Sequence, residues 1–353
     1  MILMNSRKAE SKLEEKPLNR IIVCALALAG AAIAAHATDL NAAGATFPAP
    51  IYQKWFEVYK AKNPSVQVNY QSIGSGGGIR QLSAGTVDFG ASDAPMTDEQ
   101  MSKITDFKVL HFPTVMGAVV PTYNIAGLAK DLRFTGETLA DIYLGKIAKW
   151  NDPRLVKDNP GANLPDAGIT VVHRSDGSGT TFVWSDYLSK VSPEWKSKVG
   201  AQTSVSWPVG LGQKGNEGVA GLVKETPNSI GYVELIYAVQ NQMGYGYVKN
   251  ASGVFLKADL AGVTAAAAGA AKSMPSDFRV SITNAPGKTA YPISTFTWLL
   301  MPDKIKNAGK RADIKAFLKW MLTSGQSYCA ALSYAPLPKE VAAKEMKQID
   351  RVQ

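Results

Sequence analysis

The sequence contains few of the residues on which most enzymes depend. Only two cysteines and three histidines occur among 353 residues, and no Gly-x-Ser-x-Gly nucleophile elbow is present. Two histidines remain beyond residue 37, and no carboxylates cluster with them, which argues against a catalytic metal site. We therefore expect no enzymatic activity, no metal and no other cofactor.

The positions of the two cysteines also argue against an intramolecular disulfide. Cys24 lies inside an N-terminal apolar run that we expect to be removed, so Cys329 is left without a partner. Ile22 and Val23 precede Cys24, whereas a lipoprotein signal needs small residues there, so we expect no lipid anchor. Cys329 is interpreted as a small buried apolar residue.

Basic residues exceed acidic ones but form no run. The formal net charge is +9, and the lysines and arginines are scattered along the chain. Scattered charge does not favour nucleic-acid binding, which needs a basic patch or stripe. A diffuse positive field instead speeds the arrival of a small anion.

Residues 1–37 have the features of a signal peptide. Lys16 and Arg20 precede the apolar run Ile21–Ala35, and Ala35-His36-Ala37 fits a small-x-small cleavage site. The run is too short for a membrane span, and no polar face interrupts it, so a buried N-terminal helix is disfavoured. Three glutamates among the first fifteen residues indicate a misassigned start codon. We predict export to the periplasm.

The rest of the chain alternates β-branched runs with amphipathic segments. This alternation predicts α/β sheets with parallel strands, and the length suits two lobes. Gln100 three residues after Thr97 predicts a capping box, and Thr138 with Asp141 predicts a helix start. Expected strands are residues 66–72, 86–91, 112–122, 169–172, 230–233 and 291–301, and an alanine tract at 264–272 predicts a surface helix.

The stretch His173–Thr181 predicts a strand, a turn and a helix start. Small hydroxylated residues fill the turn, and free backbone N–H groups at a helix N-terminus bind anions. Arg174 adds a fixed positive charge, and Asp176 is close enough in sequence to pair with it. A Ser178–His173 catalytic dyad is conceivable, but His173 and Arg174 point to opposite faces of a strand and cannot both serve one site.

Two further segments of the chain repeat this pattern of a strand, a turn and a helix. Gly74–Gly78 lacks the Gly-Lys-Ser/Thr ending of a P-loop, so it is either a flexible surface turn or a second anion site containing Ser75. Thr46 stands before the first helix, where it can cap the helix, bind an anion or do both. A third Gly-rich turn covers Gly210–Asn216.

Asp93 follows a short apolar strand and precedes Ala94-Pro95. Its commonest role would be that of a turn residue. In an anion site, however, a carboxylate repels a fully deprotonated anion and accepts a hydrogen bond from a protonated one. It would select hydrogen phosphate and dihydrogen phosphate over sulfate, since a charged buried acceptor left unpaired costs more than about 1–3 kcal/mol.

Together these motifs resemble the periplasmic phosphate-binding proteins of the bacterial ABC-type phosphate uptake systems. The similarity extends over residues 43–337. The family usually has a second serine where Gly76 stands, a small departure. The stretches that carry the resemblance are Ala43–Pro50, Val87–Pro95, Asp141–Ile147, Arg174–Thr180 and Ile230–Glu234.

The resemblance implies an α/β, two-lobed periplasmic binding protein fold with hinge strands, of the type II kind. The first lobe would comprise residues 38–121 and 287–353, and the second residues 122–286. It implies that Asp176 pairs with Arg174, and that the chain is a monomer which delivers phosphate to membrane permease subunits driven by a cytoplasmic ATPase. The implied phosphate ligands are Thr46, Phe47 (through its backbone), Ser75, Asp93, Arg174, Ser178, Gly179 and Thr180.

Two alternatives stay open from the sequence. A protein of this fold could bind another oxyanion, such as arsenate or sulfate. It could also be a secreted phosphatase, which would turn over phosphate esters.

Overall fold

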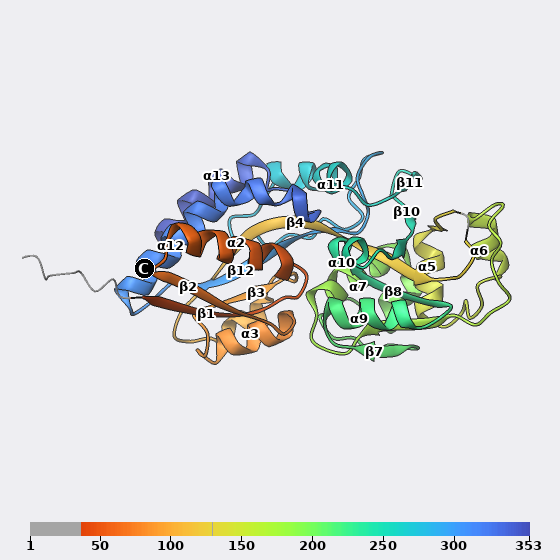
Figure 1. The fold of residues 1–353 in the computed structure, drawn as a ribbon, viewed down its shortest axis with the longest axis horizontal. Helices are drawn as coiled ribbons and strands as arrows, with labels where there is room; N and C mark the ends of the chain where they lie inside the picture. Colours follow the sequence, from red (N-terminus) through yellow and green to blue (C-terminus); the bar gives the residue numbers. More distant parts are fainter. Residues whose placement is uncertain (1–36, 129) are drawn as a thin grey trace, which may run out of the picture. The chain divides into compact units, whose positions relative to one another are not determined.

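The computed structural model describes residues 37–128 and 130–353. The predicted signal peptide, apart from Ala37, lies outside the described residues. Among the described helices, none is both long and apolar enough to cross a membrane. Residues 38–353 form one compact unit, shown in Figure 1.

The described chain is built on one large mixed sheet. Its strands follow the order β2-β1-β3-β12-β4-β8-β6-β7, and β9 pairs with β4. The bounds are β1 (Thr38–Gly44), β2 (Val66–Ser72), β3 (Phe89–Ser92), β4 (Val109–Asn124), β6 (Thr170–Arg174), β7 (Leu211–Gln213), β8 (Ser229–Glu234), β9 (Gly244–Tyr245) and β12 (Ser294–Pro302). A smaller sheet joins β5 (Arg133–Phe134), β10 (Tyr247–Lys249) and β11 (Phe255–Leu256).

The prediction of parallel sheets is wrong for the middle of this sheet. β1 is parallel to β2 and β3, and β6 is parallel to β7 and β8. β4 and β12, in contrast, run antiparallel to each other and to their outer neighbours β8 and β3. The reason is that β4 carries the chain from the first half of the sheet into the second and β12 carries it back, so these two neighbouring strands run in opposite directions.

β4 is the strand that joins the two lobes. Its residues Val109–Ala118 pair with β12, and Val119–Asn124 pair with β8. Every β4 residue except Asn124 is buried. The change of partner falls close to the predicted lobe boundary at residue 121. The observed architecture is thus the two-lobed α/β fold expected from the sequence, while the lobe boundaries stay a prediction.

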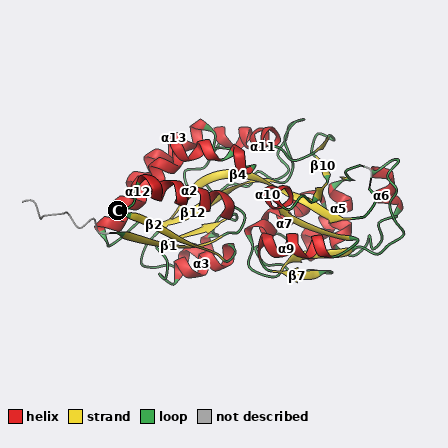
Figure 2. Ribbon diagram, in the orientation of Figure 1, coloured by secondary structure: helices red, strands yellow, loops and turns green. Residues whose placement is uncertain are grey.

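Helices cover both faces of the sheet in the first lobe. α2 and α12 pack on β2 and β1 from one side, and α3 packs on β1 and β3 from the other (Figures 1 and 2). The α-helices are α2 (Ala49–Lys62), α3 (Ser75–Ser83), α4 (Asp98–Ser102), α5 (Gly136–Tyr143), α6 (Pro153–Asp158), α7 (Gly179–Val191), α8 (Pro193–Lys198), α9 (Gly215–Glu225), α10 (Leu235–Gln240), α11 (Leu260–Lys272), α12 (Ala308–Leu322) and α13 (Lys339–Gln348). Short 3₁₀ helices are η1 (Ser324–Tyr328), η2 (Ala330–Leu332) and η3 (Ile349–Arg351).

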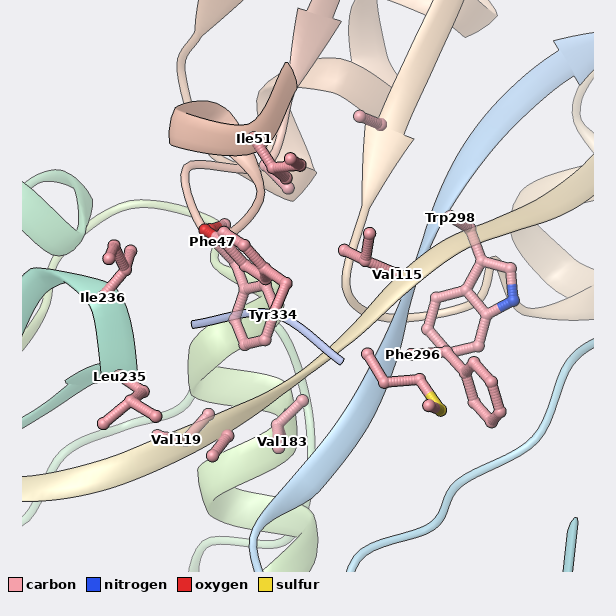
Figure 3. Packing of buried hydrophobic residues seen from close by; sticks show 14 of the residues in the cluster. Phe47, Ile51, Val115, Val119, Val183, Leu235, Ile236, Phe296, Trp298 and Tyr334 are labelled. Atoms are coloured by element: carbon pink, nitrogen blue, oxygen red, sulfur yellow. The ribbon is translucent and has the colours of Figure 1, made fainter. Parts of the chain in front are cut away.

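The hydrophobic core continues from one lobe into the other. Figure 3 shows Phe47 and Tyr334 of the first lobe close to Leu235 and Ile236 of the second, beside β4. All four side chains are at most 4% exposed. The loop after β1, which carries Thr46, is therefore held against the second lobe by apolar packing as well as by hydrogen bonds.

Several local expectations can be checked directly. The capping box is confirmed, since the side chains of Thr97 and Gln100 each bond the other residue's backbone N–H. The helix start at Thr138 is wrong: Thr135 is the N-cap of α5, and Thr138 occupies the third helical position. Cys329 is a buried free thiol, as expected.

Candidate anion-binding site

Three turns of the first lobe meet at one edge of the sheet. Thr46 follows β1, Ser75 begins α3 after β2, and Asp93 follows β3. The carboxyl ends of parallel strands share an edge, which is where α/β sheets bind ligands. Each of these three residues is at most 2% exposed. The first lobe thus presents two hydroxyls and one carboxyl group in a buried position.

The second lobe contributes a strand end and the start of a long helix. Arg174 ends β6, and Ser178 is the N-cap of α7, where its Oγ accepts from the Thr181 N–H at 3.0 Å. Gly179 and Thr180 form the first turn of α7 and are buried. Helix N-termini carry free N–H groups and a positive partial charge, so this lobe supplies mainly hydrogen-bond donors.

The two sets contact each other directly. Ser75 Oγ accepts hydrogen bonds from the backbone N–H of Asp93 at 3.2 Å and of Gly179 at 3.0 Å. The Gly76 N–H donates to the Gly177 carbonyl at 2.8 Å. A Cβ atom on Gly179 would lie 2.5 Å from Ser75 Oγ and 2.6 Å from Asp93 Oδ2, so only glycine permits this approach. The structure brings the predicted residues together; that they bind phosphate stays a prediction.

Arg174 is fixed by Asp176, and this predicted pairing is confirmed. Arg174 Nε and Nη2 donate to the two Asp176 carboxylate oxygens at 2.7 and 2.5 Å, while Nη1 lies 3.5 Å from Thr180 Oγ1. Burial opposes ionisation of Asp176, but its hydrogen bonds to Arg174 and the guanidinium charge outweigh burial and lower the pKa of Asp176. The bidentate bond leaves Nη1 directed at Thr180 and the helix start.

Asp93 is in the opposite electrostatic situation. Burial raises its pKa from the ordinary 3.8 to about 7, although a hydrogen bond from Thr297 and the charge of Arg174 oppose the rise. Thr297 Oγ1 donates to Asp93 Oδ1 at 2.9 Å. The other oxygen, Oδ2, faces the start of α7. With this raised pKa, Asp93 is a buried carboxyl group that loses its proton near neutral pH and can then accept a hydrogen bond.

Sequence reasoning missed two residues that support the site. Thr297 belongs to β12, and nothing in its apolar strand sequence pointed to Asp93. Asn216, at the start of α9, donates from Nδ2 to Thr46 Oγ1 at 2.7 Å and to Thr180 Oγ1 at 3.1 Å. Asn216 ends the third Gly-rich turn, and that turn was the signal that could have identified it.

The alternative roles considered for Thr46 and Gly74–Gly78 are not observed. No side chain caps α2, whose N-cap is Pro48, and the Thr46 hydroxyl instead contacts Asn216. Gly74 has a φ of 84° and is the N-cap of α3, so Ser75 to Gly78 form the first turn of a helix and not a flexible loop.

The backbone around Phe47 is held by two tyrosines from elsewhere in the chain. The Tyr237 hydroxyl donates to the Thr46 carbonyl at 2.6 Å, and the Tyr334 hydroxyl donates to the Phe47 carbonyl at 2.5 Å. Figure 3 shows Tyr334 beside Phe47. With their carbonyls bonded in this way, the Thr46–Phe47 peptide units have a fixed orientation, as a backbone ligand requires.

His173 does not contribute to a catalytic dyad. Its ring stacks on Trp207 with a centroid distance of 4.7 Å, on the other side of β6 from Arg174. Within residues 37–128 and 130–353, no group of three or more His, Cys, Asp or Glu side chains could hold a metal ion.

A two-lobed α/β fold with buried hydrogen-bond donors between its lobes is typical of the class of solute-binding proteins. Consistent with this, the family model of the PBP superfamily domain matches residues 29–324. A phosphate-binding protein PstS of Xylella fastidiosa is 47% identical over 312 residues, covering 88% of this chain and 84% of that protein. The chain belongs to the phosphate-binding protein PstS family.

Solved structures give the same fold. A high-affinity periplasmic phosphate-binding protein, solved with phosphate bound at pH 8.5, has a TM-score of 0.70 and 20% identity, over 88% of this chain and 93% of that one. A candidate phosphate ABC transporter substrate-binding protein with bound phosphate from Clostridium perfringens has a TM-score of 0.62 and 21% identity, over 85% of this chain and 100% of that one. At these identities the likeness concerns the fold alone.

Proposed function

We propose that this chain binds inorganic phosphate between its two lobes and delivers it to an ABC-type import permease. The observation that carries the proposal is the carboxyl group of Asp93, placed among hydroxyl and N–H donors from both lobes. An anion held there must both accept many hydrogen bonds and donate one. Protonated phosphate does both near neutral pH, and sulfate does not.

Each predicted ligand has a defined part in this proposal. The hydroxyls of Thr46, Ser75, Ser178 and Thr180 donate to phosphate oxygens, as do the backbone N–H groups of Phe47 and Gly179. Arg174 supplies the positive charge, and Asp176 orients it. Asp93 accepts the phosphate proton, so its buried carboxylate would be left unpaired by sulfate. A site built to hydrogen-bond a ligand hydroxyl rejects an analogue that lacks it by about 10⁴-fold or more.

The cellular role follows from the family and the proposed site. The chain is a binding protein and not an enzyme, as its family relatives are phosphate-binding proteins. We place it in the periplasm after removal of residues 1–37, as a monomer that passes phosphate to permease subunits driven by a cytoplasmic ATPase. Closure of the lobes around the anion would exclude water until the permease opens them.

A titration of the exported form with phosphate, arsenate and sulfate tests the proposal. Intrinsic tryptophan fluorescence reports binding, and calorimetry supplies the affinities. We expect saturable binding of phosphate and no measurable binding of sulfate. Arsenate should compete with phosphate, because it is also protonated near neutral pH. Tight sulfate binding would refute the phosphate assignment. Sustained turnover of a chromogenic phosphate ester by pure protein would overturn the non-enzyme assignment.

A further inference from the structure

The hydroxyl of Thr46 has no accepting capacity left in this structure. A hydroxyl group carries one donor proton and two acceptor lone pairs. Thr46 Oγ1 accepts from the backbone N–H of Asn216 at 3.2 Å and from its Nδ2 at 2.7 Å. Both lone pairs are occupied, so the proton of Thr46 is the only part of the hydroxyl that can still form a bond.

The hydroxyl of Thr180 is constrained in the same way. Its Oγ1 lies 3.1 Å from Asn216 Nδ2 and 3.5 Å from Arg174 Nη1, and both of these groups can only donate. Thr46 and Thr180 therefore both present a proton to whatever occupies the site. In each case one of the donors that fixes this direction is the side-chain amide of Asn216.

The orientation of the Asn216 amide is itself determined by the backbone. Asn216 Oδ1 accepts from the Glu234 N–H at 2.9 Å, and a backbone N–H cannot accept a hydrogen bond. The oxygen must therefore face Glu234, which directs the NH₂ group to the two threonines. Asn216 is fully buried, so this arrangement has no competition from bulk water.

Asn216 also connects the two lobes. It begins α9 in the second lobe, whereas Thr46 follows β1 in the first. Its contacts with Thr46 join the two lobes in this structure, whereas its contacts with Thr180 and Glu234 lie within the second lobe. An anion that needs the Thr46 proton thus needs the closed arrangement.

We propose that Asn216 is a positioning residue that turns the Thr46 and Thr180 hydroxyls into obligate donors toward the bound anion and stabilises the closed lobes. This inference rests on the proposed phosphate function. Asn216 does not itself have to touch the anion, because it acts through the two hydroxyl groups. It favours an oxyanion ligand rich in acceptors over any ligand that would offer donors at these two positions.

The test compares Asn216→Ala, Asn216→Asp and Thr46→Val by calorimetry and stopped-flow fluorescence with phosphate. Asn216→Ala should weaken binding about 10- to 100-fold, as expected for two lost hydrogen bonds. The loss should appear in the dissociation rate, with the association rate unchanged, because the contacts with Thr46 form on closure. Asn216→Asp keeps the side-chain volume and the oxygen that accepts from the Glu234 N–H. Its second carboxylate oxygen, however, would accept the threonine protons in place of the ligand, so this variant should weaken binding further.

A double-mutant cycle separates this role from a merely structural one. If Asn216 acts through Thr46, then Asn216→Ala should cost much less affinity in a Thr46→Val background than in the unmutated protein. The matched control is Asn124→Ala. It removes a hydrogen bond from the Asn124 side-chain amide to the Lys224 carbonyl at the far end of α9, and it should leave phosphate binding within about twofold.

The outcomes distinguish the two proposals. Additive effects in the cycle, or unchanged binding by Asn216→Asp, would overturn the role of Asn216 while phosphate binding by the unmutated protein still stands. Failure of the unmutated protein to bind phosphate would instead overturn the proposed function. If Asn216→Ala does not fold, as judged by thermal unfolding without phosphate, the cycle is run with Asn216→Asp, whose side chain fits the same space.

Discussion

The two lobes each bring one aspartate to the site, and the two carboxyl groups behave in opposite ways. Asp176 of the second lobe bonds a guanidinium with both oxygens, and its pKa is lowered. Asp93 of the first lobe has a hydroxyl as its side-chain donor, and burial raises its pKa to about 7. In the proposed function the same residue type therefore serves two purposes: Asp176 would orient the charge that attracts the anion, while Asp93 would discriminate between anions that carry a proton and anions that do not.

If the proposed site binds phosphate, the comparison predicts that affinity and selectivity are divided between the lobes. Most donors of the proposed site and its buried cation, Arg174, belong to the second lobe, with the start of α7. The acceptor belongs to the first lobe. Substitutions in the second lobe should therefore lower binding of every oxyanion, and substitutions at Asp93 should change the preference among oxyanions.

Removal of the buried charge should have the largest effect. Arg174→Ala removes the positive charge from the anion and leaves it facing the Asp176 carboxylate without the guanidinium between them, so we expect roughly a 10³-fold loss of phosphate affinity, or about 4 kcal/mol. Calorimetry measures the loss. Arg154→Ala, which breaks a partly exposed ion pair with Asp141 in the same lobe, is the control and should bind normally. Retention of affinity within tenfold by Arg174→Ala would contradict the division between lobes.

Blocking the contact between lobes should rank second. In Gly179→Ala the added methyl would lie 2.6 Å from Asp93 Cβ and 2.5 Å from Ser75 Oγ, so the lobes cannot approach as observed. We expect about 100-fold weaker phosphate binding, because such overpacking costs roughly 1–3 kcal/mol. The control is Gly221→Ala in α9, where the Cβ would meet nothing within 4 Å. Normal affinity in Gly179→Ala would show that the observed closure is not needed for binding.

The selectivity of the first lobe is tested with Asp93→Asn. An amide offers sulfate a donor where the ionised carboxylate offers only repulsion, so the phosphate-to-sulfate affinity ratio measured above pH 7 should fall by about 100-fold. Competition titrations with both anions measure the ratio. Asp88→Asn, which alters a carboxylate bonded to Lys310 away from the site, should leave it unchanged. An unaltered ratio in Asp93→Asn would show that Asp93 does not discriminate between protonated and unprotonated anions.

The raised pKa of Asp93 predicts a smaller effect, on stability. Between about pH 4 and pH 7, and without ligand, the raised pKa means that the folded protein holds a proton on Asp93 that the unfolded chain, with a pKa near 3.8, releases. Stability from this group is therefore present at low pH and lost as pH rises through about 7. Between pH 6 and pH 8 the loss should be about 1.4 kcal/mol. Urea unfolding at both pH values measures it.

Asp93→Asn is also the control for this measurement. Glu234 and Glu345 are buried carboxyl groups with raised pKa values as well, and they are present in both proteins. The difference in pH dependence between the unmutated protein and Asp93→Asn therefore isolates Asp93. An identical pH dependence in the two proteins would mean that Asp93 is ionised and hydrated before phosphate arrives.

Local features were predictable because they depend on neighbouring residues. The strand Val66–Ser72 has the predicted bounds, and the capping box at Thr97 is present. The pairing of Arg174 with Asp176 needs only a strand end and one intervening residue. The start of α5 failed for a local reason too, since Thr135 and Thr138 both suit an N-cap and only their mutual hydrogen bonds decide between them.

The sequence by itself determined the chemical inventory of this protein: a helix start next to Arg174 and Asp176 that suits an anion, a carboxyl group at Asp93, and a scarcity of catalytic and metal-binding residues. Only the tertiary structure decided how these groups act. Thr297 lies 204 residues from Asp93, and Asn216 lies 170 residues from Thr46. Burial and contacts over such separations raise the pKa of Asp93 and fix the direction of the hydroxyl protons, and no local pattern in the chain encodes them.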